Sequence, residues 1–397
     1  MTTCVPRPSK ADTSDIPDLP EGVPPLRAFY LYLSNSCNLA CRHCWITPRR
    51  IMGRPDPGEI IGLDDLAAAV EEGKKLGLAS VKLTGGEPML HPHFGEIVDL
   101  MSSHGLNMVM ETNATLMTAE MAHHLKNHST MDFLSVSLDS TDEAAHDAFR
   151  GVPGAFAAAL QGLDHLVAAG FDTIQVIMSV HRGNVHEVEK MARFAAAHGA
   201  ASIKYSPVTS SGRGRDMQER GETLGFEDIL SLSRFVYTEL GERLRADNIS
   251  IVPVLNVPPA LMPLTEIMRR EGATGDCGVL GILGILGSGE IALCGIGRNI
   301  PELTYGRLGE SSIRDIWLHH PTILRLRAEL EEVDSYPDIC RECAMARHCR
   351  TGCVAQNYVN GRRLVWPDAL CRQAVESGVF PETRRKKPSS IRNQKSI

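Results

Sequence analysis

Three cysteines near the start of the chain have the residue type and spacing of a metal-cluster site. Cys37, Cys41 and Cys44 form a C-x3-C-x2-C arrangement. Thiolates are the usual protein ligands of iron–sulfur clusters, and a [4Fe–4S] cluster that only transfers electrons normally has four of them. Three thiolates leave the fourth iron without a protein ligand, so that iron could bind a small molecule. The spacing therefore predicts an open cluster with a chemical role.

A zinc site is the alternative interpretation of this triad. Structural zinc takes four ligands, and His43 could be the fourth. His43 lies between two of the cysteines, however, so the backbone would have to fold sharply to direct all of them at one metal. The sequence favours the iron–sulfur interpretation.

The chain around the triad alternates short apolar runs with amphipathic stretches. Strands are expected at 29–34, 80–84, 107–111, 133–138, 174–180 and 202–206, and helices at 63–76, 94–104, 118–127, 155–169 and 186–198. Further along the chain, one long amphipathic helix is expected near 312–332. Such alternation predicts parallel strands joined by right-handed helical crossovers. Six units are too few for a closed eight-stranded barrel, so we expect an α/β fold with a partial (β/α)6 barrel. Its active site should lie at the C-terminal ends of the strands.

Several motifs stand at those predicted strand ends. The cysteine stretch 37–45 is followed by Thr84-Gly85-Gly86-Glu87-Pro88, then by Ser137-Leu138-Asp139 and an HDxxRG stretch at 146–151. Together they resemble the radical SAM superfamily. That resemblance implies that the unique iron of a [4Fe–4S] cluster binds S-adenosylmethionine (SAM). One-electron reduction then releases methionine and a 5′-deoxyadenosyl radical, and the protein positions the cofactor and excludes water.

The same resemblance implies a set of SAM-binding residues. They are Gly85, Gly86, Glu87, Asn113, Ser137, Asp139, Arg150 and Asn184. Each could instead be a turn residue, a helix cap or a surface ion-pair partner. Their shared location at strand ends favours the SAM site.

Seven further cysteines occupy the C-terminal third. They are Cys277, Cys294, Cys340, Cys343, Cys349, Cys353 and Cys371. Their spacing resembles the SPASM extension of radical SAM maturases, which implies two auxiliary [4Fe–4S] clusters. Cys340, Cys343, Cys349 and Cys371 would hold one, and Cys277, Cys294 and Cys353 the other. The three-cysteine cluster would have an open iron or an oxygen ligand such as Asp276, and a zinc ribbon is the alternative.

Two auxiliary clusters suggest an oxidation. Removing a hydrogen atom leaves a carbon radical, and forming a new bond then requires the loss of one more electron. We therefore expect a peptide maturase that forms a thioether or other cross-link in a ribosomally made peptide. Maturation of sulfatases, by oxidising Ser or Cys to formylglycine, is a weaker alternative because Gly295 replaces the acidic residue of that branch. Asp276, Tyr205 and His181 are candidate bases, and a non-catalytic electron carrier is the alternative from another class.

Composition and charge indicate the location and the partners of the protein. The net charge is −7, and no long apolar run or basic leader is visible, so a cytoplasmic enzyme without nucleic-acid or membrane partners is expected. The predicted organisation is an irregular arm at 1–27, the barrel at 28–250, a linker at 251–276, the SPASM domain at 277–375 and a disordered basic tail at 376–397. A flavodoxin or ferredoxin would supply electrons, and a separate protein could recognise a leader peptide.

Overall fold

The computed structural model describes residues 19–48, 50–51, 54–55, 60–269, 278–295 and 300–386. A ten-stranded sheet forms its centre, in the order β12-β11-β10-β1-β4-β5-β6-β7-β8-β9. The strands are β1 (Ala28–Ser34), β4 (Ser80–Gly85), β5 (Asn107–Thr112), β6 (Met131–Ser137), β7 (Ile174–Val180), β8 (Ser202–Pro207), β9 (Val252–Leu255), β10 (Ile282–Ile285), β11 (Glu290–Ala292) and β12 (Thr304–Arg307). A separate hairpin pairs β2 (Arg50–Ile51) with β3 (Arg54–Pro55).

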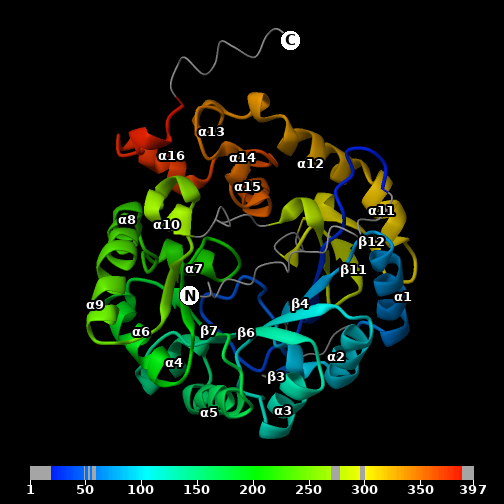
Figure 1. The fold of residues 1–397 in the computed structure, drawn as a ribbon, viewed down its shortest axis with the longest axis horizontal. Helices are drawn as coiled ribbons and strands as arrows, with labels where there is room; N and C mark the ends of the chain where they lie inside the picture. The colour runs from blue at the N-terminus through cyan, green and yellow to red at the C-terminus, as the bar shows by residue number, and fades with distance from the viewer. Residues whose placement is uncertain are drawn as a thin grey trace.

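Pairing is parallel from β10 through β1 and on to β9, and antiparallel from β10 to β12. Figure 1 shows the strands curving around a common centre with helices outside them. The expected partial α/β barrel is confirmed, and all six predicted strands are present. Their C-terminal ends meet at one mouth.

Helices cover the outer face of the sheet. In the barrel they are α1 (Leu63–Lys74), α2 (Phe94–Ser103), α3 (Ala119–Asn127), α4 (Glu143–Arg150), α5 (Ala155–Ala168), α6 (Val188–Ala197), α7 (Gly214–Glu219), α8 (Phe226–Arg234), α9 (Gly241–Ala246) and α10 (Leu264–Arg269). A π-helical segment, Phe235–Leu240, joins α8 to α9. Alternate strand residues such as Val81 and Leu83 are buried against these helices. Burial of each such side chain stabilises the fold by about 1.5–3 kcal/mol.

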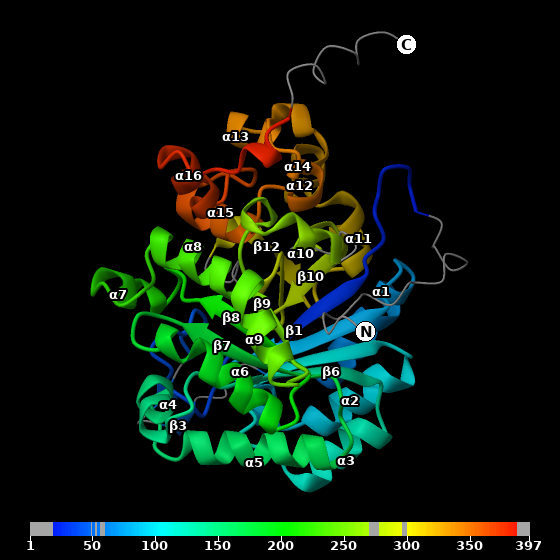
Figure 2. The same cartoon turned by 60° about the vertical axis from the view of Figure 1, so that its left-hand side comes forward.

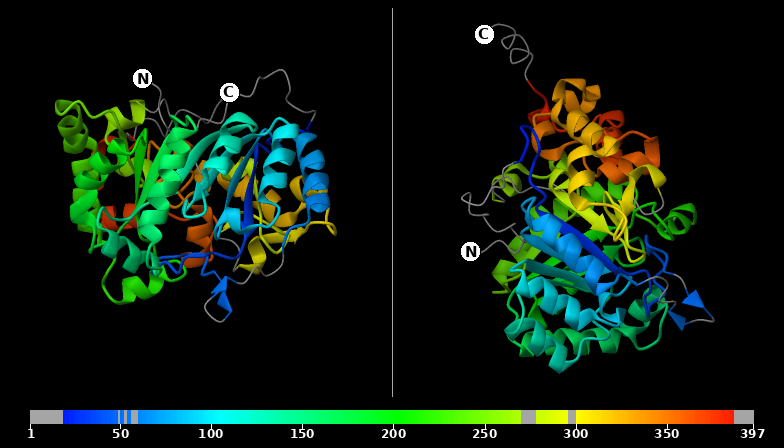
Figure 3. Two further views of the ribbon diagram at one scale, coloured as in Figure 1. Left: turned by 90° about the horizontal axis from the view of Figure 1, so that it is seen from below. Right: turned by 90° about the vertical axis from the view of Figure 1, so that its right-hand side faces the viewer.

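The C-terminal third adds six helices. They are α11 (Ile313–His319), α12 (Pro321–Glu331), α13 (Asp338–Arg341), α14 (Ala346–Cys349), α15 (Val354–Gly361) and α16 (Ala369–Glu376). Figure 2 shows α13 to α16 gathered together beyond the barrel strands, and Figure 3 shows the same group from two other sides. The described chain contains no helix that is long and apolar enough to cross a membrane.

Four details differ from the sequence-based expectations. Helix α4 was missed because it has only 8 residues, too few to show a clear helical period; it begins at the N-cap Asp142, whose side chain accepts from the backbone of Ala145. The single helix expected at 312–332 is divided, because Pro321 cannot continue α11 and instead begins α12. The segment 251–276 is not simply a linker, since it begins with β9, an edge strand that tolerates Pro253.

The fourth difference is the C-terminal tail. Residues up to Lys386 are ordered rather than disordered, because Arg384 is 3% exposed and its Nη2 donates to the carbonyl of Met262 at 2.6 Å. Cys343 and Arg385 also form a β-bridge. The remainder of the basic tail, from Lys387, lies outside the described residues, as does most of the N-terminal arm.

Candidate active site at the mouth of the barrel

The cysteine loop follows β1 and is fixed on one side by the end of β4. The backbone N–H of Gly86 donates to the carbonyl of Ser34, and that of Glu87 donates to the carbonyl of Ser36, each at 2.8 Å. A Cβ on Gly86 would overlap the Ser36 carbonyl, so only glycine permits this approach. The two glycines were expected to let the backbone approach SAM. In the structure they also let β4 lie against the cysteine loop.

The other side of the loop is fixed by the end of α4. The N–H of Ala40 donates to the carbonyl of Arg150, and the N–H of Arg42 donates to the carbonyl of Phe149, each at 2.9 Å. Gly151 has a φ of +73°, and a Cβ there would meet the carbonyl of Ala40. The loop therefore has a fixed backbone between two rigid elements.

N–H donors point at two of the three sulfurs. Cys37 Sγ accepts from the N–H of Leu39 at 3.4 Å and lies 3.8 Å from Asn113 Nδ2, and the Arg150 guanidinium donates to Cys41 Sγ at 3.6 Å. Burial raises the pKa of the Cys37 thiol to about 12, so this thiol would be neutral on its own. Buried sulfurs that receive N–H donors suit thiolates whose charge a metal cluster compensates. The donor set thus fits the [4Fe–4S] cluster.

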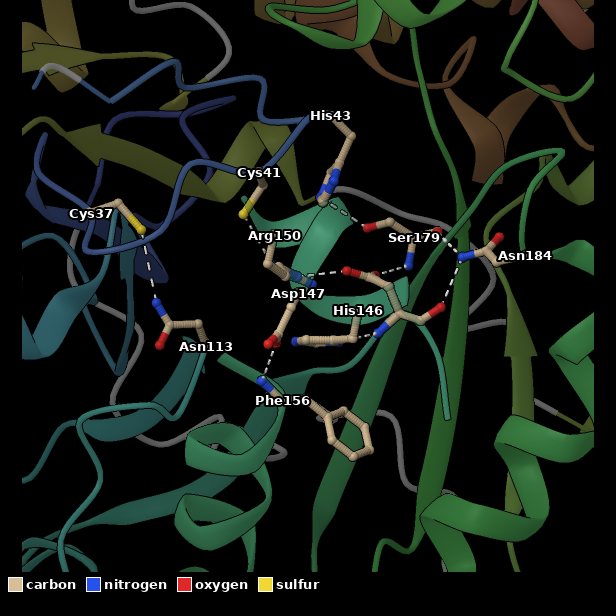
Figure 4. A network of polar contacts seen from close by, with 11 residues as sticks. Cys37, Cys41, His43, Asn113, His146, Asp147, Arg150, Phe156, Ser179 and Asn184 are labelled. Carbon is tan, nitrogen blue, oxygen red and sulfur yellow. Dashed lines mark hydrogen bonds and ion pairs between the residues drawn. The ribbon is translucent and has the colours of Figure 1, made fainter. Parts of the chain in front are cut away.

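A buried ion pair underlies the loop (Figure 4). Arg150 Nε lies 2.6 Å from Asp139 Oδ2, and the two side chains are 8% and 1% exposed. Asp139 Oδ1 also accepts from the backbone N–H of Ser179 at 2.8 Å. Although burial opposes ionisation, the charge of Arg150 holds the pKa of Asp139 below its usual range. This pair connects the end of β6, the last turn of α4 and Cys41.

Glu87 is completely buried. Its carboxylate accepts from Thr112 Oγ1 at 2.8 Å, from the N–H of Asn113 at 2.9 Å and from the N–H of Met89 at 3.3 Å. Burial raises its pKa to about 7. In the structure, the Glu87 carboxylate holds the turn from which the Asn113 side chain points toward Cys37. The predicted direct contact of Glu87 with SAM stays a prediction.

Asn184 and Ser137 complete the predicted SAM residues. Asn184 Nδ2 donates to the carbonyls of Asp139 and Ser179 at 2.9 and 3.0 Å, and its Oδ1 accepts from the N–H of His181 at 2.8 Å. Asn184 therefore ties the turn after β7 to the end of β6. Ser137 is half-buried at the last position of β6. Their contacts with SAM stay predictions.

The His43 side chain contacts other protein groups and not the position of a metal ligand. Its Nε2 lies 3.1 Å from Ser179 Oγ, and its ring stacks on Phe149 at 4.6 Å. Burial lowers its pKa to about 4. Among the described residues, no group of three or more His, Cys, Asp or Glu side chains is placed to hold a single metal ion, as zinc would require. A four-iron cluster is larger than one ion, so its ligands stand further apart.

The three candidate bases differ in their surroundings. Tyr205 is fully buried, and its hydroxyl donates to the carbonyl of Val188 in α6 at 2.7 Å. Its packing role leaves its assignment as a base without support. His181 is half-buried, stacks on Phe149 at 4.4 Å, and has its pKa lowered by burial. Asp276 lies outside the described residues.

Four of the C-terminal cysteines lie together. Burial raises the pKa of Cys371, and the nearby charges of Asp368, Cys349, Cys340 and Cys343 raise it further. These thiols come from α13, the turn after it, α14 and α16. They are the same four that the SPASM resemblance groups into one cluster, and that ligand set stays a prediction. Of the other three cysteines, Cys294 follows β11, Cys353 begins α15, and Cys277 lies outside the described residues.

Gly295 lies against two aromatic rings of the barrel. A Cβ at this position would overlap the Tyr32 ring and the Trp45 ring. These rings pack edge to face with centroids 6.0 Å apart. Tyr32 is 8% exposed, and burial, followed by the charge of Cys294, raises its pKa. The place of an acidic side chain after Cys294 is thus filled by aromatic packing.

Sequence reasoning missed a charged group on the inner face of the barrel, made by Lys82, Glu111 and Lys204. Lys82 Nζ lies 2.6 Å from Glu111 Oε1. The signal was present, because these residues interrupt apolar runs with period two, which places them on the face opposite the buried aliphatic residues.

Comparison with known proteins agrees with this geometry. Residues 31–195 match the radical SAM superfamily. The chain is 27% identical over 354 residues to a mycofactocin maturase, MftC, of Mycobacterium ulcerans, covering 89% of each chain. It is 27% identical to an AdoMet-dependent heme synthase of Nitratidesulfovibrio vulgaris, covering 86% of this chain and 90% of the relative. It is 31% identical to the subtilosin biosynthesis protein AlbA of Bacillus subtilis over 49% of this chain and 42% of the relative.

Two solved structures share the fold. Streptococcus suis SuiB bound to S-adenosylmethionine superposes with a TM-score of 0.68 at 16% identity, covering 88% of this chain and 77% of that chain. The protein anSMEcpe with bound AdoMet and a peptide gives 0.65 at 16% identity, covering 89% and 95%. Residues 31–195 thus carry a radical SAM domain, and this domain and the relatives together show that the chain is an enzyme; the family implies a [4Fe–4S] cluster and SAM.

Proposed function

We propose that this enzyme oxidatively modifies a side chain or backbone carbon of a ribosomally made peptide, forming a thioether or another cross-link. The observation that carries the proposal is the grouping of Cys340, Cys343, Cys349 and Cys371 away from the SAM triad. Cys343 and Cys371 pack in one apolar cluster, α13 with Cys340 contacts α16, and the charge of Cys349 acts on the pKa of Cys371. Four thiolates are the usual ligand set of an electron-transfer cluster. A second site of this kind gives the reaction an electron acceptor, which a simple hydrogen abstraction does not need.

The chain's own residues prepare the reaction. Cys37, Cys41 and Cys44 hold the cluster that, with SAM, supplies the initiating radical. The Asp139–Arg150 pair and Asn113 fix the loop and direct N–H donors at its sulfurs. Donors toward a sulfur stabilise its negative charge and thereby tune the cluster's potential.

The substrate gives up two electrons in this scheme. One leaves with a hydrogen atom from a carbon, and the auxiliary clusters that the C-terminal cysteines would hold would accept the second. Cys294 and Cys353, with Cys277, would hold the nearer auxiliary cluster. Its open iron could bind a substrate thiolate or serve only in electron transfer. A flavodoxin or ferredoxin would deliver the electron that starts each cycle, and a separate protein could present the peptide leader.

Sulfatase-type maturation is a weaker candidate for a structural reason. Its acidic residue after Cys294 is absent, and the packing of Tyr32 and Trp45 against Gly295 leaves no space for one. Mycofactocin maturases and AlbA, by contrast, are relatives whose names place them in peptide biosynthesis.

Anaerobic reconstitution with a short Cys-rich peptide encoded beside this chain's gene tests the proposal. Three clusters predict about twelve irons per chain. Cys371→Ala should remove about four of them. It should leave SAM cleavage intact and prevent the peptide from losing the mass of two hydrogen atoms. Cys4→Ala, which changes a cysteine outside the predicted ligand sets, is the matched control. Peptide oxidation at the wild-type rate by Cys371→Ala would refute the electron-acceptor role, and formylglycine formation in a sulfatase peptide would favour the alternative.

A further inference from the structure

The barrel interior contains a charged group that the SAM site does not use. Lys82 of β4 and Glu111 of β5 form an ion pair of 2.6 Å, and Thr84 Oγ1 donates to the other oxygen of Glu111 at 3.2 Å. Lys82 Nζ also lies 5.2 Å from the centroid of the Tyr30 ring. The side chains of Lys82 and Glu111 remain 24% and 35% exposed. Solvent therefore reaches this pair, unlike the sealed Asp139–Arg150 pair.

Lys204 joins the pair from across the barrel. It lies on β8, which β6 and β7 separate from β5 in the sheet. Its neighbour Tyr205 bonds outward to α6, so Lys204 projects to the opposite, concave face. The Glu111 charge acts on the pKa of Lys204, as two residues this far apart in the sheet can do across the concave face. We call Lys82, Glu111 and Lys204 the inner charge cluster.

The inner charge cluster contains two lysines and one glutamate, so positive groups outnumber negative ones by one. Glu111 is already paired with Lys82. Among the described residues, Lys204 has neither an ion pair nor a hydrogen bond of its own. Burial, and then the charge of Lys82, lower its pKa, because an ammonium at this place is poorly hydrated. A carboxylate from outside the chain would supply that partner.

The inner charge cluster also lies beside the elements that hold the SAM triad. Thr84 directly precedes Gly85, and Glu111 is followed by Thr112 and Asn113, which support the cysteine loop. On the other side, Lys82 is paired with Tyr30 of β1, which is paired with Gly284 of β10, and a Cβ on Gly284 would meet Cys294 at the end of the β10–β11 hairpin. The inner charge cluster therefore lies between the SAM triad and the hairpin that presents Cys294.

We propose that Lys204, assisted by Lys82, binds a carboxylate of the peptide substrate and so places the neighbouring carbon beneath the cysteine loop. The carboxylate belongs either to the peptide C-terminus or to an Asp or Glu side chain. Glu111 limits the site to one anionic group, because a second would face its negative charge. This inference rests on the proposed peptide substrate and specifies which peptides the site accepts.

Lysine acylation read by mass spectrometry tests the site without knowledge of the natural substrate. The reconstituted holoenzyme is treated with an acylating reagent in three mixtures of N-acetylated random pentapeptides. One mixture has no Asp or Glu and an amidated C-terminus, the second has a free C-terminal acid, and the third is amidated but contains Asp and Glu. At a peptide concentration about four times Kd, occupancy slows acylation of Lys204 about five-fold. Exposed Lys190 on α6 is the control and should not change.

Protection by the second or the third mixture identifies the source of the carboxylate. Glu111→Gln should strengthen protection in the same mixture, because it removes the competing negative charge. Equal acylation of Lys204 in all three mixtures, or no acylation of Lys204 in any of them, would overturn the inference. If no mixture slows acylation of Lys204 while the enzyme still oxidises its peptide, the carboxylate site alone is rejected. Protection without any peptide oxidation rejects the proposed function alone.

Discussion

Replacing Arg150 by Met is the perturbation whose effect the structure defines most closely. The substitution leaves the Asp139 carboxylate 1% exposed without its cationic partner. Breaking a buried pair in this way costs about 3–5 kcal/mol. The entropy of unfolding of a chain of 397 residues then converts this loss into a fall in melting temperature of roughly 4–6 °C.

The assay is thermal unfolding of the apoprotein at neutral pH, which separates the ion pair from cluster binding. The double variant Asp139→Asn/Arg150→Met is the matched control. It removes the isolated charge, and the Asn oxygen can still accept from Ser179, so it should recover a large part of the loss. An Arg150→Met protein that melts within 1 °C of wild type, or a double variant that melts no higher than the single one, would refute the reasoning.

The pH dependence of this effect has a defined sign. The folded pKa of Asp139 lies below its ordinary value of 3.8. The contribution of the pair is therefore complete above pH 3.8 and is lost as the pH falls through the folded pKa. The difference between wild type and Arg150→Met should shrink as the pH falls, beginning where the unpartnered Asp139 of the variant, whose pKa burial raises, takes up a proton.

Three further predictions concern single positions. Gly86→Ala should displace the cysteine loop and lower the iron content by about four per chain; Gly95→Ala, in open space on α2, is the control and should retain full iron. Gly295→Ala should destabilise the fold by about 1–3 kcal/mol in thermal unfolding, and it should cost less when it is added to a Tyr32→Ala chain than to wild type; a single variant as stable as wild type would contradict the packing. Tyr205→Phe should cost about 1 kcal/mol by unpairing a buried carbonyl. It should leave peptide oxidation unchanged, whereas lost oxidation by a folded variant that still cleaves SAM would support Tyr205 as the base.

The sequence predicted the barrel well because its signals are local. Apolar runs of period two and glycines after helices specify the strands and their connections, and the six predicted strands are all found. The ends of elements were less certain. Pro321 divides the expected C-terminal helix, and β9 was missed because Pro253 and the prolines that follow the strand are typical of a linker.

The sequence predicted which residues form the candidate site but not which groups these residues contact. The cysteine spacing identified Cys37, Cys41 and Cys44. No local sequence signal, however, indicates that Arg150 donates to Cys41, which is 109 residues away in the sequence. Tertiary packing also decides that the Asn184 side chain hydrogen-bonds to backbone groups and that Tyr205 faces α6. The inner charge cluster was missed for the same reason, because its members are distant in sequence and meet only when the sheet curves.

The central claim is that Cys37, Cys41 and Cys44 hold the cluster that cleaves SAM. It is tested most directly by measuring 5′-deoxyadenosine after the reconstituted enzyme is mixed anaerobically with SAM and dithionite. Wild type and Cys371→Ala should form this product, and single Ala substitutions of Cys37, Cys41 or Cys44 should abolish it. Formation of 5′-deoxyadenosine at the wild-type rate by any one of those three variants would contradict the account.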